Sequence, residues 1–191
     1  MKCCARTTPP EASLLTSKRS CDVGYGINIY PRSRLMDRFQ IDALISADLT
    51  EIVVDQRVYE QKPPNRFRFS LAHEIAHLIL HAEVYRSLVF KTPEQWKAVM
   101  LGLAANDYNW LEWQANTFAG LLLVPPAHLR QQSNDIQAKM RSGQLDPSRL
   151  DEQGIDRVIR MLAQRLAVSR AVIERRLQKD EIWPYDQRGI R

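Results

Sequence analysis

Cysteine is scarce in this sequence, and long apolar runs are absent. Three cysteines among 191 residues are an odd number without metal-type spacing, so a disulfide framework is not expected. No apolar run is long enough for a signal peptide or a membrane span. We therefore expect a protein of the reducing cytoplasm that has no membrane partner.

Five consecutive residues, His73-Glu74-Ile75-Ala76-His77, carry the strongest functional signal. On a helix, side chains four residues apart lie on the same face, so both imidazoles can bind one zinc ion. Glu74 can then take a proton from a water at the metal, which is the zinc-metallopeptidase interpretation of this pattern. The alternative is a helix with two surface or half-buried histidines.

The surrounding residues favour a helix through this motif. No proline or glycine interrupts residues 70–83, and Ser70 is the predicted N-cap. Apolar residues flank the motif: Leu71, Ile75, Leu78 and Leu80.

A catalytic zinc ion usually has three protein ligands, so a third must be found. The candidates are His81, His128, Glu112 and the cysteines. Along an unbroken helix, His81 lies about 12 Å from His73, at ~1.5 Å per residue. Three histidines spread over that length cannot reach one ion, so we predict a structural or supporting role for His81.

Glu112 is the better candidate for the third ligand. It lies in an apolar segment, residues 110–124, that we predict to be a helix ending before Pro125. A carboxylate in such a segment is costly unless it is paired or bound to metal. Asn116, four residues on, can hydrogen-bond a ligand. A solvated position for Glu112 on an amphipathic helix is an equally open alternative at this point.

The stretch from Arg68 to His81, followed by Glu112–Ala119, resembles the ImmA/IrrE family of metallopeptidases. The similar region begins near Glu51 and extends to about Leu129. The resemblance implies that the zinc ligands are His73, His77 and Glu112, and that Glu74 is the general base. Ala76 stands where the family more often has glycine; alanine is the better helix former, so the chemistry is unaffected.

Two segments around these motifs predict further structure. Glu51–Asp55 is β-branched and short enough for a strand. In zincin-like folds an edge strand can hold an extended peptide by sheet addition, but an ordinary core strand fits the pattern equally well. Thr92 is the predicted N-cap of a helix with Pro93 in its first turn and Gln95 completing a capping box. Candidates by chemistry for stabilising charge on the attacked carbonyl oxygen are Tyr59, Arg68, Tyr108 and His128.

The C-terminal part is polar from residue 131 to 154, where we expect loops around a short helix. Two helices then follow, with Ser169 as the cap of the second, which makes a helix-turn-helix-like hairpin. Between Arg157 and Lys179 there are seven basic residues and one acidic residue, an excess of six in a chain of net charge +5. Such a patch fits nucleic acid or an acidic protein, although a solvated helix face supporting the peptidase part is slightly favoured, as the family resemblance also implies.

The predicted fold is α+β: a zincin-like domain, with a small twisted sheet packed on the active-site helices, followed by a C-terminal helical hairpin. We expect a flexible tail at residues 1–22 with Cys3 and Cys4 as free thiols, the peptidase domain at 23–130, and the helical segment at 131–191.

The predicted function is zinc-dependent hydrolysis of a peptide bond. The resemblance implies that the substrate is a helix-turn-helix repressor or antitoxin, cut to release genes under stress or in mobile elements. Two alternatives are a non-catalytic, zinc-stabilised regulator whose basic hairpin binds DNA, and a binding module for a toxin-antitoxin-type partner. Glu74 disfavours both, because a purely structural zinc site needs no base.

Overall fold

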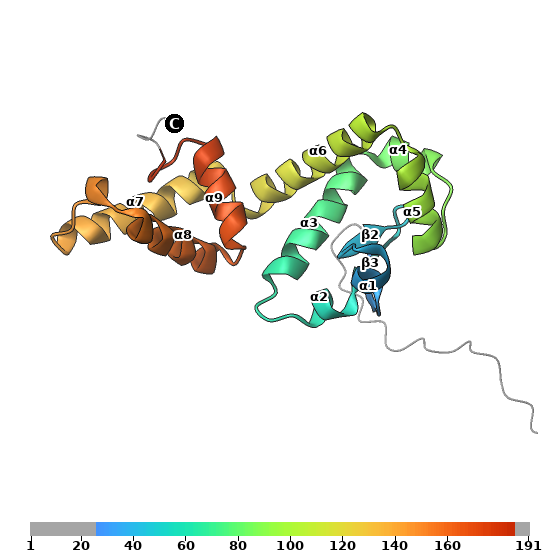
Figure 1. Ribbon diagram of the computed structural model, residues 1–191, viewed down its shortest axis with the longest axis horizontal. Coiled ribbons are helices and arrows are strands. Elements are labelled where there is room, and N and C mark those ends of the chain that lie inside the picture. The colour runs from blue at the N-terminus through green and yellow to red at the C-terminus, as the bar shows by residue number, and fades with distance from the viewer. Residues whose placement is uncertain (1–25, 186–191) are drawn as a thin grey trace, which may run out of the picture.

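The computed structural model describes residues 26–185. Two groups of elements are joined by the long helix α6 (Figure 1), with the sheet and α1–α5 on one side and α7–α9 on the other. The first group comprises β1 (Asn28–Arg32), α1 (Leu35–Phe39), β2 (Ala43–Ile45), β3 (Glu51–Asp55), α2 (Gln56–Glu60), α3 (Asn65–Leu80), α4 (Ala82–Ser87) and α5 (Pro93–Gly102). It is followed by α6 (Ala105–Leu123), α7 (Pro126–Ser142), the 3-10 turn η1 (Pro147–Arg149), α8 (Glu152–Leu166) and α9 (Arg170–Lys179). The α+β class predicted from the sequence is confirmed.

The sheet has the strand order β1-β3-β2, with β1 parallel and β2 antiparallel to β3. The strand predicted at Glu51–Asp55 is confirmed, and it is the central strand, buried from Ile52 onward. The interpretation of this segment as an ordinary core strand is therefore correct. The strand β2, which the sequence pattern did not predict, lies at an edge of the sheet. Asp55 joins β3 to the short helices, since its carboxylate accepts from the N–H groups of Met36 and Arg57 at 3.0 and 2.9 Å.

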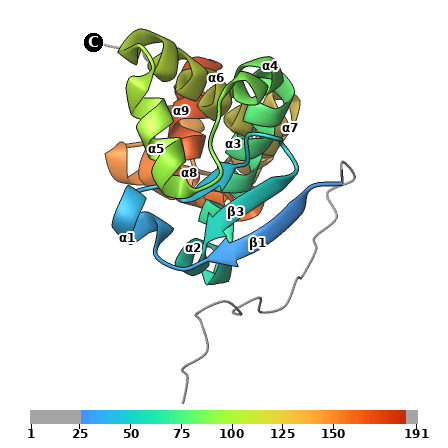
Figure 2. The ribbon, with the colours of Figure 1, turned by 90° about the vertical axis from the view of Figure 1, so that its right-hand side faces the viewer.

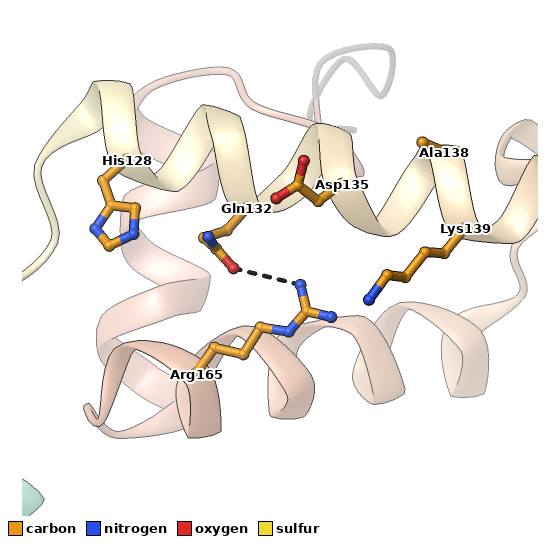
Figure 3. Close-up of a pocket in the computed structure, with 6 residues that line it drawn as sticks. All are labelled: His128, Gln132, Asp135, Ala138, Lys139 and Arg165. Carbon is orange, nitrogen blue, oxygen red and sulfur yellow. Dashed lines mark hydrogen bonds between the residues drawn. The ribbon is translucent and has the colours of Figure 1, made fainter.

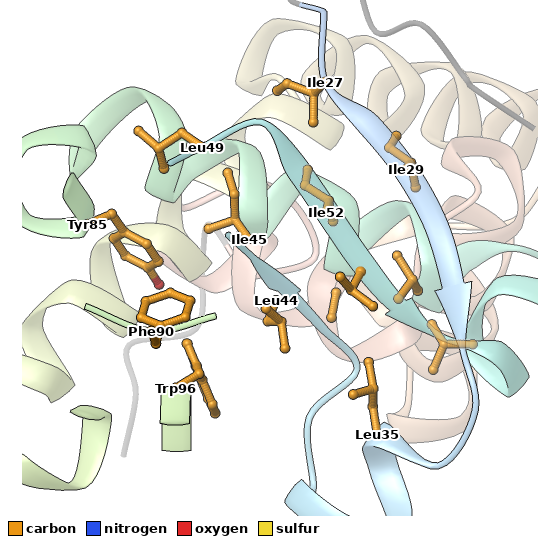
Figure 4. Close-up of a cluster of buried hydrophobic side chains, with 14 of the residues drawn as sticks. Ile27, Ile29, Leu35, Leu44, Ile45, Leu49, Ile52, Tyr85, Phe90 and Trp96 are labelled. Atoms are coloured by element: carbon orange, nitrogen blue, oxygen red, sulfur yellow. The ribbon is translucent and has the colours of Figure 1, made fainter. Parts of the chain in front are cut away.

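A first hydrophobic cluster fills the space between this sheet and the helices (Figure 4). Ile45 and Ile52 are fully buried, and Tyr85, Phe90 and Trp96 pack against the same cluster from α4, α5 and the segment between them. Seen from the side, β1 and β3 lie in front of α3 and the C-terminal helices, while α1 and α5 lie beside the strands (Figure 2). Burying a large apolar side chain contributes about 1.5–3 kcal/mol, so this cluster holds β2 firmly beside α3.

Helix α3 begins earlier than predicted. It starts at Asn65, directly after two prolines, so the prediction that Ser70 is its N-cap is wrong. Ser70 is buried inside the helix, and its hydroxyl donates to Asp42 Oδ2 at 3.3 Å. The helix ends at Leu80, although no proline or glycine follows before residue 83, because His81 leaves the helical conformation with φ −123° and ψ 19°. A helix can thus end without glycine or proline where tertiary contacts hold the last side chain.

The helix start predicted at Thr92 is confirmed. Helix α5 begins at Pro93, and the Thr92 hydroxyl accepts from the Gln95 N–H at 3.3 Å. The Gln95 side chain in turn accepts from the Lys91 N–H at 2.8 Å, so the reciprocal bond of the capping box reaches one residue further back than expected.

A second hydrophobic cluster holds α7, α8 and α9 together. The expectation of loops over residues 131–154 is wrong for α7, which runs unbroken from Pro126 to Ser142. Its buried positions Leu129, Ser133 and Ile136 recur at helical spacing, a signal masked by the polar residues between them. The predicted hairpin is confirmed: α8 ends at Leu166 and is followed by Ala167 in the left-handed conformation, and Ser169 caps α9 by accepting from the Val172 N–H at 3.3 Å.

The two groups of elements meet where the start of α3 faces the α8–α9 turn. Arg68 donates to the main-chain oxygens of Leu166 and Ala167 at 3.4 and 2.8 Å, and Asn65 Nδ2 donates to Val168 O at 3.2 Å. The division after residue 130 stays a prediction: residue 131 lies inside α7, and the second cluster already includes Val124.

The expected tail at residues 1–22, with Cys3 and Cys4, lies outside the described residues. Within residues 26–185, no helix is both long and apolar enough to cross a membrane.

Candidate metal centre

Helix α3 presents His73 and His77 on one face. Their Nε2 atoms are 3.1 Å apart, and their ring centroids are 4.8 Å apart at an interplanar angle of 69°. His77 is buried and His73 is partly exposed. The four-residue spacing thus brings two imidazole nitrogens to one point, as the motif predicts.

Helix α6 packs along α3 and brings Glu112 to the same point. Glu112 Oε2 is 3.1 Å from His73 Nε2, and Oε1 is 3.5 Å from His77 Nε2. The ligand atoms of the three residues lie within 4.8 Å of one another. Ligands at zinc-binding distance in a tetrahedral site stand about 3.4 Å apart, so these separations fit a shared metal ion. The solvated alternative for Glu112 does not hold, because its carboxylate faces the histidines.

Charge and hydrogen bonding in this cluster favour an ionised carboxylate. Burial alone would raise the pKa of Glu112, but hydrogen bonds and charge interactions with His73 and His77 outweigh it and lower the pKa to about 2. Burial alone would lower the pKa of His73, but the hydrogen bond to Glu112 and the charges of the nearby carboxylates outweigh it, so that the pKa of His73 is raised. Two nitrogens and an anionic oxygen form a donor set that suits zinc.

Glu74 is buried beside these three residues. It lines the same cavity of about 280 Å³, and its Oε2 accepts from the Ile45 main-chain N–H at 2.9 Å. Burial raises the pKa of Glu74, while the neighbouring histidines oppose that effect. A carboxylate with a raised pKa suits a group that must both take up and release a proton.

Two further side chains, Asn116 and His81, contact the histidines of the candidate metal site. Asn116 hydrogen-bonds His73, and its Nδ2 donates to the Glu112 main-chain oxygen at 2.8 Å. His81 Nδ1 is 3.0 Å from His77 Nδ1, on the side of the ring away from Glu112, and His81 Nε2 is 2.9 Å from Gln114 Oε1. Such partners hold a ligand imidazole in one orientation and tautomer. His81 is therefore placed as a supporting residue.

Among the four predicted candidates for stabilising the attacked carbonyl oxygen, Tyr108 lines this cavity. Burial and the charges of Glu112 and Glu74 raise its pKa, so the phenol keeps its proton at neutral pH. The other three lie elsewhere. Tyr59 packs edge-on against Phe67, and Arg68 binds the main chain at Leu166 and Ala167. His128 lines a separate cavity between α7 and α8, beside Gln132 and Arg165 (Figure 3).

The edge strand β2 forms one wall of the cavity. Asp55 N–H donates to Asp42 O and Ser46 N–H donates to Glu51 O, at 2.7 and 2.9 Å. Because pairing alternates along an antiparallel strand, Ala43 and Ile45 direct their main-chain groups away from β3. Ile45 uses its N–H for Glu74, and Ala43 lines the cavity.

Sequence reasoning missed several residues of this site. Ile45 lies in a strand of three residues, too short for an alternating pattern to reveal. Tyr85, whose buried ring lies 5.0 Å from that of His77, and Trp96 both line the cavity and belong to the core as well. Gln114 had no signal beyond its place between Glu112 and Asn116.

A helix with two histidines, a carboxylate from a second helix and a buried glutamate next to the first histidine form a candidate metal site of the kind expected for a zincin-like fold. The chain belongs to the peptidase family M78: the family model described as the IrrE N-terminal-like domain matches residues 57–178. The resemblance to the ImmA/IrrE family and the zincin-like fold class are thereby confirmed.

Other comparisons add little to the family assignment. No curated protein matches this chain. A solved structure, a Mycobacterium tuberculosis transcriptional regulator, is similar with 16% identity and a TM-score of 0.47, over 87% of this chain and 40% of that chain. The chain thus spans less than half the length of that protein.

Proposed function

We propose that this protein is a zinc-dependent metallopeptidase that cuts a helix-turn-helix transcriptional repressor or antitoxin. The observation that carries the proposal is the buried Glu74 carboxylate in the same cavity as His73, His77 and Glu112. A metal site with a purely structural role gains nothing from a second, buried carboxylate, which is costly to desolvate. Family membership supports the same conclusion.

Zinc held by His73, His77 and Glu112 would polarise the substrate carbonyl and lower the pKa of an attacking water towards about 7. Glu74 takes the proton from that water and delivers it to the leaving amine. The Ile45 N–H holds Glu74 in position, at 2.9 Å from its Oε2. The protonated phenol of Tyr108 donates a hydrogen bond to the developing negative charge on the carbonyl oxygen.

The edge strand β2 would hold the substrate. An extended peptide can add to the sheet there, because Ala43 directs its main-chain groups outward along the wall of the cavity. This places the peptide across the metal centre with its backbone fixed and its side chains alternating between the two sides. Binding of this kind requires a substrate segment that is extended or can unfold locally.

The regulator as substrate is inferred from the family, whose members typically cut one site in such a protein. The test is to co-express the protein with the helix-turn-helix regulators encoded next to it and to search for a discrete fragment by mass spectrometry. We expect a fragment with the wild type and none with Glu74→Gln, whose hydrolysis should be about 10²–10⁴-fold slower.

A matched control is Glu83→Gln, which makes the same change at an exposed position of α4 and should leave the fragment unchanged. A fragment produced equally by Glu74→Gln would show that the base lies elsewhere. A stable complex that contains zinc and yields no fragment would instead favour the non-catalytic binding module, and salt-sensitive DNA binding that survives Glu74→Gln would favour the DNA-binding regulator.

A further inference from the structure

A second cavity, of about 1010 Å³, lies between the start of α3, α6 and α9. We call it the α6–α9 groove. Residues that characterise it are Asn65, Trp113, Arg175, Arg176 and Lys179. Phe69 and Asn116 line both this groove and the cavity of the metal centre, so the two cavities adjoin.

The groove is positively charged. Its described lining includes four cationic side chains and no carboxylate: Arg66, Arg175, Arg176 and Lys179. Arg66 and Arg176 are each neutralised by an aspartate from outside the lining, Asp42 and Asp180, both at 2.6 Å. Arg175 and Lys179 are exposed on α9, where Lys179 Nζ lies 5.5 Å from the ring centroid of Trp113. These two cations carry the uncompensated charge of the groove.

Three polar atoms of the groove-lining residues are buried without a hydrogen-bond partner. They are Asn65 Oδ1, an acceptor, and Arg176 Nε and Nη2, two donors, of which Nη2 forms an ion pair with Asp180. The Arg176 side chain is only 6% exposed, and its contact with Asp180 does not satisfy Nε. Buried polar groups are normally paired, because leaving one unpaired costs about 1–3 kcal/mol. Because these atoms are buried, a ligand in the groove can pair with them only if the lining side chains move.

We propose that the α6–α9 groove binds an acidic segment of the protein substrate, on one side of the bond that is cut at the metal centre. This inference rests on the proposed function. Carboxylates of the substrate pair with Arg175 and Lys179, since guanidinium and ammonium groups form charge-assisted bonds with carboxylates. Trp113 is about half exposed and stacks on Trp110 with ring centroids 4.8 Å apart, so it adds apolar aromatic surface to the groove wall beside Lys179.

The charge of the groove favours a peptide over a nucleic acid. Nucleic-acid binding depends on neutralising several phosphates with lysine and arginine, whereas this groove has two uncompensated cations. Its remaining polar groups, including Asn65 and Thr117, suit main-chain amides. The shared wall with the metal centre also means that a chain leaving the scissile bond can enter the groove directly.

The first test uses cleavage of a proteome-derived peptide library by the zinc-loaded, full-length protein, with products identified by mass spectrometry. We expect Asp and Glu to be enriched at a fixed distance on one side of the cut. Arg175→Glu with Lys179→Glu should abolish this enrichment and favour Lys and Arg instead. The control is Arg141→Glu with Arg157→Glu, the same charge change at exposed positions outside the groove, which should keep the wild-type profile. Cleavage without acidic enrichment, or a profile unchanged in the groove variant, would overturn the proposal.

The second test measures binding alone, so that it remains decisive if no peptide is cut and the proposed function fails. Zinc-loaded Glu74→Gln protein is titrated into fluorescein-labelled 12-residue peptides of alternating Glu and Ala or alternating Gln and Ala. We expect the Glu peptide to bind about tenfold more tightly, the gain of two exposed ion pairs, and the groove variant to lose this difference. Equal affinity for the two peptides overturns the inference. Tighter binding of a 12-residue oligothymidylate, also lost in the groove variant, would assign the groove to nucleic acid instead.

Discussion

The metal centre and the α6–α9 groove lie side by side, yet their polar groups are arranged in opposite ways. In the described part of the chain, every buried side-chain nitrogen or oxygen without a hydrogen-bond partner belongs to Asn65, Arg176 or Asp180, at or beside the groove. At the metal centre the buried polar side chains have partners within the protein: Glu74 binds Ile45, and His77 contacts His73 and His81. The metal centre is preorganised by the fold, whereas residues at the groove keep buried polar atoms without a hydrogen-bond partner.

The difference follows from which elements build each region. The metal centre forms where α3 and α6 pack together, against a sheet that belongs to the same hydrophobic cluster as the side chains around α3. The groove forms where both groups of elements meet, because α9 belongs to the second cluster. Packing within one core fixes side chains in one arrangement, whereas a junction between cores leaves surfaces that a ligand can complete.

The largest effect is expected for Glu112→Ala. Removing the anionic ligand leaves His73 and His77 as the remaining donors, so zinc affinity should fall by more than about 100-fold, beyond the effect of losing a supporting residue. The measurement is zinc content after dialysis against a chelator buffer, by mass spectrometry of the metal. Glu83→Ala, an exposed glutamate on α4, should keep the wild-type content. Full zinc content in Glu112→Ala would mean that the metal centre is built from other residues.

Asn116→Ala tests whether the metal centre and the groove depend on the same side chain, because Asn116 lines both cavities. Losing its hydrogen bond to His73 should weaken zinc affinity or activity by about 10–100-fold. Competition with a fluorescent zinc chelator measures the affinity, and Asn109→Ala, at an exposed position of the same helix, is the control. If this variant keeps wild-type zinc affinity and activity but binds peptide less well, Asn116 acts in the groove and not at the metal centre.

The smallest effect, and one of opposite sign, is expected for Gly120→Ala in the groove wall. A Cβ atom there would lie 3.6 Å from Arg176 Cδ, an ordinary contact, within helix α6. Alanine should therefore raise the free energy of unfolding by about 0.5–1 kcal/mol, measured by urea denaturation. Gly154→Ala in α8 is the contrasting variant, because its Cβ would lie 2.8 Å from Leu150 Cδ2 and should cancel the gain. A lower free energy of unfolding in Gly120→Ala would show that the added methyl group does not fit. The groove wall would then be packed as tightly as the metal centre.

Much of the candidate site could be anticipated from residue spacing. The helical repeat brings His73 and His77 to one face, and the cost of burying an unpaired carboxylate pointed to Glu112. Both arguments need only the local sequence and general chemistry. The resemblance to a known family added the pairing of the two helices, which lie 35 residues apart from His77 to Glu112 and for which spacing alone left other third ligands open.

The helix limits could be anticipated only in part. Thr92 and Ser169 cap their helices as predicted, because a hydroxyl that accepts from an N–H three residues on is a local interaction. Ser70 has the same chemistry but lies inside α3, where its hydroxyl reaches Asp42 instead. A local signal is overridden when a distant element offers the side chain another partner.

Local chemistry along the chain decides the placement of His73 and His77 on one helix face, the helical hairpin and the class of fold, since each depends on neighbours within a few turns. Long-range packing decides the rest. It places β3 at the centre of the sheet and β2 at an edge, brings the Ile45 N–H to Glu74, places His81 against His77, and opens the α6–α9 groove beside the metal centre. These features join residues far apart in sequence, and their positions follow from how two hydrophobic cores are filled, which no periodicity in the sequence encodes.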